Sequence, residues 1–147
     1  MQFIKPKKQL EIIKQNVDAI IPEDEFIEKL ESSYEKNVPL RVKAGFDPTT
    51  SYLHLGHSLI LRKLKVFQEL GHQICFLIGD FTAKIGDPTG RDKTRPPLDE
   101  EIIGNNASTY KDQMFKILED KNVEILYNSK WFNGFDLSSL IQLTSLE

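Results

Sequence analysis

The chain begins with two stretches whose apolar residues recur at helical spacing. Residues 7–21 carry one apolar stripe, and a second stripe starts after Pro22, with acidic residues in its first turn, where negative charge suits the helix dipole. The apolar positions are Leu10, Ile13, Val17, Ile20 and Ile21 in the first helix and Phe26, Ile27, Leu30 and Tyr34 in the second. We therefore assign residues 1–39 to an N-terminal helical segment that packs on the core.

From residue 40 onward, short apolar runs alternate with longer helical stretches. The run 73–79 is almost continuously apolar and too short for an independent helix, which is typical of a parallel strand covered on both faces. Strand, helix and strand within about 40 residues form a βαβ unit, whose crossover is expected to be right-handed. The predicted strands are 40–46, 73–79 and 123–127, and the predicted helices are 56–70, 100–120 and 137–146. The pattern predicts an α/β fold with a parallel sheet.

Residues at the helix ends support two of these assignments. Gly71 follows one predicted helix in the position where glycine commonly ends a helix, and Asp99 is placed to cap the start of another. Residues 104–106 (Gly-Asn-Asn) are poor helix formers and weaken the second assignment.

Composition narrows the class of protein. The 147 residues suit a single domain, 39% of them are apolar, and the net charge of −3 gives no reason to expect a uniformly basic surface for nucleic acid. The single cysteine, Cys75, lies in an apolar run and is expected in the core, without a disulfide. We find no signal peptide and no apolar run of membrane length, so a cytoplasmic protein is expected, with no membrane partner.

The most informative stretch runs from Lys43 to His57. An apolar strand leads through a turn-forming loop into His54-Leu55-Gly56-His57 at the predicted start of a helix. Unpaired backbone N–H groups and the helix dipole at such a junction attract phosphate, and imidazole groups can donate to oxygens that gain charge during phosphoryl or adenylyl transfer. Nucleotide chemistry is therefore predicted. The alternative is one buried and one surface histidine beside a helix-initiating glycine.

A second polar loop, residues 79–95, follows the next strand. Ligands of parallel sheets bind beyond the carboxyl ends of the strands, so the two loops are expected to face one crevice. A carboxylate there can pair with an ammonium group, and arginines can close over a polyphosphate. The alternative is an ordinary mobile loop whose charges keep it soluble.

Three motifs occur in order. They are Gly45-Phe46-Asp47-Pro48-Thr49, His54-Leu55-Gly56-His57 and Ile85-Gly86-Asp87-Pro88-Thr89-Gly90. In this order and spacing the chain resembles the N-terminal half of the catalytic domain of bacterial tyrosyl-tRNA synthetases, class I enzymes whose HIGH signature is replaced here by HLGH. The resemblance covers residues 41–135. It implies that residues 40–147 form the first half of a Rossmann-like (HUP-type) domain.

The resemblance also implies roles for individual residues. ATP would contact Gly45, Phe46, Asp47, Pro48, Thr49, His54, Leu55, Gly56 and His57. Tyrosine would contact Lys43, Gly45, Thr82 and Asp87, with the Asp87 carboxylate pairing with the substrate ammonium. The residues expected to act on the transition state are Thr49, His54, His57, Arg91 and Arg95. Magnesium would arrive with ATP, held mainly by its phosphates, so neither a dedicated metal site nor a tightly bound cofactor is expected.

The sequence departs from the family pattern in two ways. Lys43 stands where some members have a tyrosine that touches the substrate phenol, and Ala44 replaces a residue that can reach the ribose. The second half of the domain, with its KMSKS loop, has no counterpart before Glu147. We therefore expect an N-terminal fragment with little adenylate synthesis of its own. The tRNA would bind mainly through the missing domains, and the full-length protein would be a homodimer.

Two other functions stay open from the sequence. Another HxGH nucleotidyltransferase, such as one that adenylates a phosphopantetheine, would share the strand, loop and helix but would not require the loop after residue 79. A binding module or subunit interface would require no chemistry at all.

Overall fold

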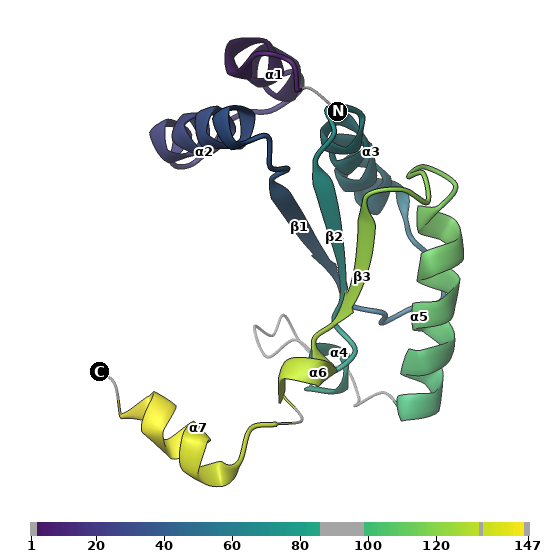
Figure 1. Ribbon diagram of the computed structural model, residues 1–147. Coiled ribbons are helices and arrows are strands. Elements are labelled where there is room, and N and C mark those ends of the chain that lie inside the picture. Colours follow the sequence, from purple (N-terminus) through teal and green to yellow (C-terminus); the bar gives the residue numbers. More distant parts are fainter. Residues whose placement is uncertain (1–2, 86–98, 133, 146–147) are drawn as a thin grey trace.

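The computed structural model of the chain describes residues 3–85, 99–132 and 134–145. Three strands form a parallel sheet in the order β1-β2-β3 (Figure 1). The strands are β1 (Arg41–Phe46), β2 (Gln73–Ile78) and β3 (Val123–Tyr127), and Phe46, Ile78 and Tyr127 lie in register at their carboxyl ends. The predicted α/β fold with a parallel sheet is confirmed, so the loops that follow the strands all leave from the same edge.

Two long helices connect the strands, and both lie on the same face of the sheet. They are α3 (Leu55–Glu69) and α5 (Glu100–Met114) (Figure 1). When strand order follows chain order, two crossovers of the same hand must place their helices on one side. The side chains that fill the space between sheet and helices include Phe46, Ile74, Phe76, Ile78, Leu61, Leu64, Phe67, Ala107, Tyr110 and Met114.

The other face of β2 is covered by side chains of the neighbouring strands rather than by helices. Cys75, between Lys43 and Glu124 in the register, is 3% exposed, as expected for a core residue. Glu124 forms an ion pair with Arg41 at 2.8 Å from the far side of β2, and its carboxylate also lies 3.8 Å from the Cys75 sulfur. The nearly continuous apolar run therefore identified the buried central strand correctly. Among the described residues, neighbouring strand side chains rather than a layer of helices lie beside Cys75 on the second face.

The N-terminal segment differs from its prediction at one end. α2 (Glu23–Lys36) begins as expected, but α1 spans only Pro6–Ile13, so the predicted helix over 7–21 was too long. Lys63 of α3 donates to the carbonyl oxygens of Ile13 and Gln15, at 2.9 and 2.7 Å, which satisfies acceptors that a longer helix would have used. Ile21, predicted to face inward, is 89% exposed.

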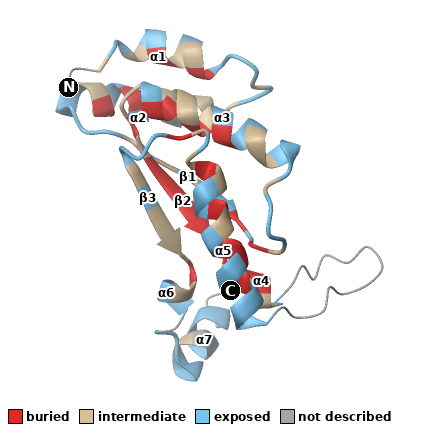
Figure 2. Cartoon of the chain, turned by 90° about the vertical axis from the view of Figure 1, so that its right-hand side faces the viewer, coloured by how far each residue is buried: buried red, intermediate tan, exposed pale blue. Residues whose placement is uncertain are grey.

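The remaining helices are short or end early. α5 was predicted to reach residue 120, but it ends at Met114, and a turn then buries Leu118. α4 (Thr82–Ile85) and α6 (Ser129–Phe132), which were not predicted, follow the carboxyl ends of β2 and β3. α7 (Leu137–Thr144) starts where expected, and its surface is exposed in Figure 2. Among the residues described, no helix is long and apolar enough to cross a membrane.

α3 ends as its sequence predicted. Gly71 has a positive φ of 94°, and its N–H and that of His72 donate to the carbonyl oxygens of Gln68 and Phe67, each at 3.0 Å. This pair of hydrogen bonds is a Schellman motif, in which glycine avoids the strain that a side chain would bring at positive φ. The turn places the His72 ring beneath α1.

His72 joins the N-terminal segment to the sheet. Its Nδ1 accepts the Leu40 N–H at 3.1 Å, and its Nε2 lies 2.8 Å from Gln9 Oε1, so the neutral ring carries its hydrogen on Nε2. Phe3 stacks on the ring with 5.5 Å between ring centres. Neither residue of this buried pair, Gln9 or His72, is exposed to solvent.

We expect acid to weaken this attachment. Burial lowers the pKa of His72 below its ordinary value of 6.5, so the unfolded chain takes up the proton more readily than the folded one. Stability present above about pH 6.5 is therefore lost as the pH falls. Urea unfolding between about pH 7.5 and about pH 5 measures this slope, and His72→Gln should flatten it. Equal slopes in the two proteins would contradict the assignment.

Candidate active site

The loop between β1 and α3 ends in a cap built from two histidines. His54 Nδ1 accepts the Gly56 N–H at 3.1 Å, and His57 Nδ1 accepts the His54 N–H at 3.2 Å. The pair therefore fills the reciprocal role that Ser and Glu fill in a capping box. The rings stack with 3.8 Å between their centres. His54 is exposed and His57 is half-buried. The alternative considered from the sequence was one buried and one surface histidine, and neither ring is buried here.

This arrangement fixes which nitrogen can serve a ligand. An Nδ1 that accepts a backbone N–H carries no hydrogen, so in the neutral rings both Nε2 atoms are donors. Burial, followed by the charge of His54, lowers the pKa of His57, which keeps its imidazole neutral at physiological pH. The Nε2–H groups of the two rings are thus donors beside the first turn of α3, next to the positive end of its dipole.

Gly56 has little room for a side chain. A Cβ at this position would lie 3.0 Å from His54 Cε1 and 3.1 Å from His54 Nδ1. Gly45 differs, because a Cβ there would meet Lys43 and Leu77 only at ordinary contact distances, 3.7 and 3.8 Å. Glycine at position 56 therefore preserves the position of the His54 ring, whereas glycine at position 45 leaves an exposed surface beside Lys43.

The loops after β1 and β2 meet at Gly79. Thr82 Oγ1 donates to Asp47 Oδ1 at 2.8 Å, across 35 residues of sequence. A Cβ on Gly79 would lie 1.8 Å from Asp47 Oδ1 and 2.5 Å from Thr82 Oγ1, so a side chain at this position would displace both groups. The structure thus brings together Asp47 from the predicted ATP group and Thr82 from the predicted tyrosine group. Asp87, Arg91 and Arg95 lie outside the described residues.

A third strand end completes this junction. Asn128, buried directly after β3, accepts the Phe81 N–H at 2.8 Å and donates to Thr82 Oγ1 at 3.1 Å. Asp80 accepts from the backbone N–H and the hydroxyl of Ser129, at 3.0 and 2.6 Å. From the sequence alone Asn128 had no assigned role, although its place at a strand's carboxyl end was a usable signal.

Helix α5 holds the first loop from the side. Its residues Asn106, Thr109, Tyr110 and Gln113 follow the spacing i, i+3, i+4, i+7 and so share one face. All four contact backbone atoms of residues 47–53. Asn106, regarded from the sequence only as a poor helix former, is buried and donates to the Pro48 carbonyl at 3.0 Å.

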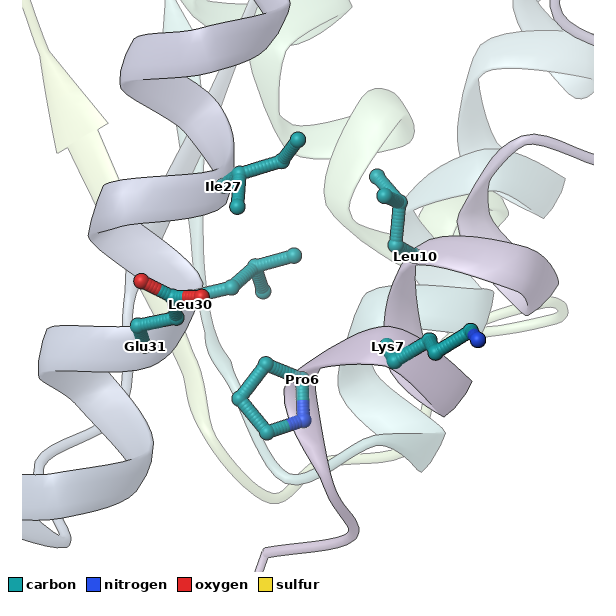
Figure 3. Close-up of a pocket in the computed structure, with 6 residues that line it drawn as sticks. All are labelled: Pro6, Lys7, Leu10, Ile27, Leu30 and Glu31. Atoms are coloured by element: carbon teal, nitrogen blue, oxygen red, sulfur yellow. The ribbon is translucent and has the colours of Figure 1, made fainter.

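A groove lies elsewhere, between α1 and α2 (Figure 3). Its lining consists of Pro6, Lys7, Leu10, Ile27, Leu30 and Glu31. None of these residues belongs to the motifs that suggested nucleotide chemistry. The junction at the strand ends, where the polar groups converge, is therefore the better candidate for chemistry.

Comparison with known proteins identifies the family. The family described as tRNA synthetases class I (W and Y) matches residues 35–145, most of the chain. The chain belongs to this family. As a class I synthetase, it has its HLGH motif at the start of α3, directly after the first strand of the sheet. This family differs from the phosphopantetheine adenylyltransferases considered from the sequence, so the match favours the synthetase over that alternative.

Relatives of this class I synthetase are similar over nearly the whole chain. The tyrosine--tRNA ligase of Aromatoleum aromaticum is 54% identical over 136 residues, which cover 92% of this chain and 33% of the relative. That of Aquifex aeolicus is 51% identical over 138 residues, with 94% and 34% covered. The chain thus spans about a third of the length of these relatives.

Solved structures agree with the fold of the class I synthetase. The tyrosyl-tRNA synthetase of Archaeoglobus fulgidus, solved with L-tyrosine, has a TM-score of 0.76 at 20% identity, covering 97% of this chain and 41% of that one. The tryptophanyl-tRNA synthetase of Plasmodium falciparum has a TM-score of 0.58 at 15% identity, with 99% and 44% covered. Both are too distant in sequence to assign a substrate.

Proposed function

We propose that this chain supplies the first half of the catalytic domain of a tyrosine–tRNA ligase, which joins tyrosine to AMP and then transfers it to tRNA. Relatives at 54% and 51% identity carry that name. The observation that carries the proposal is the hydrogen bond between Thr82 and Asp47, because it joins the loops assigned to tyrosine and to ATP. A site of this kind can hold two reactants side by side.

In the proposed reaction a tyrosine carboxylate oxygen attacks the α-phosphorus of ATP. The bond between that phosphorus and the bridging oxygen breaks, and pyrophosphate leaves with the negative charge. The start of α3 and the two Nε2–H donors of His54 and His57 are placed to stabilise oxygens that gain charge in this step. Because both rings are anchored by backbone hydrogen bonds, little reorganisation is needed when the charge develops.

The other assigned residues bind the two substrates and the leaving pyrophosphate. ATP is bound by the residues of the first loop and the start of α3, which besides the two histidines are Gly45, Phe46, Asp47, Pro48, Thr49, Leu55 and Gly56. Tyrosine is bound by Lys43, Gly45 and Thr82. The Asp87 carboxylate pairs with the tyrosine ammonium, and Arg91 and Arg95 grip the leaving pyrophosphate. Magnesium enters with ATP. In the full-length protein we further propose a cytoplasmic homodimer that binds tRNA mainly outside this chain.

Amino-acid-dependent exchange of pyrophosphate into ATP tests the proposal. The full-length gene product is assayed with each of the twenty amino acids in turn. Tyrosine should support exchange, and charging of a tRNA pool with labelled tyrosine should follow. Exchange with tryptophan alone would contradict the choice of substrate, since the family includes both specificities. Absence of exchange with every amino acid would contradict the activity itself.

A further inference from the structure

Side chains of helix α5 form hydrogen bonds with the backbone of the loop between β1 and α3 at both ends of the loop. At the start, the Asn106 side-chain amide donates to the Pro48 carbonyl at 3.0 Å, one residue before Thr49. At the end, Gln113 Oε1 accepts the Leu53 N–H at 2.8 Å, one residue before His54. Both contacts are made to backbone, so they constrain the path of the loop whatever its side chains are.

Two side chains of α5 donate to the carbonyl oxygen of Ser51. Gln113 Nε2 donates to the Ser51 carbonyl at 3.0 Å, and Thr109 Oγ1 donates to the same oxygen at 2.6 Å. Gln113 therefore pairs with residues 51 and 53 much as a neighbouring strand would, with one donor and one acceptor. Such a pair fixes position and orientation together, which a single hydrogen bond does not.

The helix that carries these groups is itself fixed. Ile103, Ala107, Tyr110 and Met114 are buried on its inner side, and the Asp99 side chain caps its first turn by accepting the Glu101 N–H at 3.0 Å. A polar side chain on a packed helix transmits that rigidity to the loop it holds. The loop, in turn, sets where His54 begins α3.

We propose that Gln113 and Thr109 are positioning residues for adenylate formation, acting through the loop backbone on His54 and Thr49. This inference rests on the proposed function of the loop as the ATP site. Neither side chain needs to touch a substrate. Since a displacement of about 1 Å can lower a rate about a hundredfold, the loss of this grip should reduce catalysis more than it reduces folding.

The chain offers a matched control at the opposite end of the sheet. Gln68 of α3 grips the turn after α5 in the same manner, accepting the Glu119 N–H at 3.0 Å and donating to the Glu119 and Lys121 carbonyls at 2.8 and 2.6 Å. Gln68→Met and Gln113→Met remove comparable backbone contacts with similar side-chain volume. Only the second change acts on the loop before His54.

The test is pyrophosphate exchange in the full-length gene product, with unfolding curves to correct for folded fraction. Gln113→Met should lower kcat/KM for ATP about 10- to 100-fold, with KM for tyrosine nearly unchanged. Thr109→Val is a milder change and should lower kcat/KM for ATP about fivefold. This variant tests the proposal if Gln113→Met does not fold. Gln68→Met should lower stability alone.

The outcomes separate this inference from the function on which it rests. An inactive wild type would overturn the proposed function. An active wild type, with Gln113→Met and Thr109→Val no more impaired in kcat/KM for ATP than Gln68→Met, would overturn the positioning role while the function stands. A loss of kcat/KM for ATP that only follows the loss of folded protein would also overturn it, because it would indicate a general structural defect.

Discussion

Gly79→Ala is expected to push the Asp47 carboxylate and the Thr82 hydroxyl apart and to destabilise the protein by roughly 1–2 kcal/mol. The new Cβ would lie 1.8 Å from Asp47 Oδ1 and 2.5 Å from Thr82 Oγ1. Gly79 is buried at the end of β2, and its N–H donates to the Phe46 carbonyl at 3.0 Å, so the backbone cannot retreat without losing contact with β1. The hydrogen bond between Asp47 and Thr82 should break. Chemical denaturation measures the change in the free energy of unfolding.

The same substitution elsewhere provides the control. Gly104 lies within α5, is exposed, and would meet nothing within 4 Å of a new Cβ. Gly104→Ala should therefore stabilise the protein by about 0.5–1 kcal/mol, as alanine does inside an exposed helix. Equal effects of the two substitutions would contradict the steric account of Gly79.

His54→Asn is expected to remove catalysis while keeping the helix cap. Asparagine is among the best capping residues, so its side-chain oxygen should still accept the Gly56 N–H. With that oxygen on the Gly56 N–H, the asparagine Nδ2–H2 group lies where His54 has its Cδ2 atom, so it falls short of the position of the His54 Nε2–H. Loss of one such donor should lower kcat for adenylate formation about 10²- to 10³-fold, with a smaller change in KM for ATP, because the donor acts on charge that develops in the transition state.

His54→Ala separates the two roles of this residue. It removes both the cap and the donor, and the lost cap should cost about 1 kcal/mol of stability that His54→Asn retains. Pyrophosphate exchange and denaturation are measured on both variants of the full-length gene product. Near-normal kcat in His54→Asn would mean that the histidine serves only to start α3.

The strands, two helix ends and the position of the first two loops could be predicted from the sequence. The strands after residue 40 were placed within one residue. For β2 the reason is its almost uninterrupted apolar run, which leaves few alternatives to a buried parallel strand. Gly71 and Asp99 marked helix ends through local chemistry that acts over only a few residues. The meeting of the first two loops followed from parallel topology, which sends both from one edge of the sheet.

What the sequence did not predict depends on contacts between distant residues. α1 ends early at a turn in which Asn16 has a positive φ of 56°, and Lys63, 50 residues further along the chain, donates to the carbonyl of Ile13. Gln68, His72 and Gln113 are polar residues that bind backbone groups 32 to 62 residues away. Periodicity indicates which way a side chain faces, but the partner of a buried amide is known only once the elements have packed.

The central claim is that the loops after β1 and β2 form a single site, and a double-mutant cycle tests it most directly. Asp47→Ala, Thr82→Val and the double variant of the full-length gene product are compared by kcat/KM for tyrosine-dependent pyrophosphate exchange. Because Thr82 Oγ1 donates to Asp47 Oδ1 at 2.8 Å, the two losses should be non-additive by about 1–3 kcal/mol. Additive losses, with Asp47→Ala affecting only ATP and Thr82→Val only tyrosine, would contradict the claim.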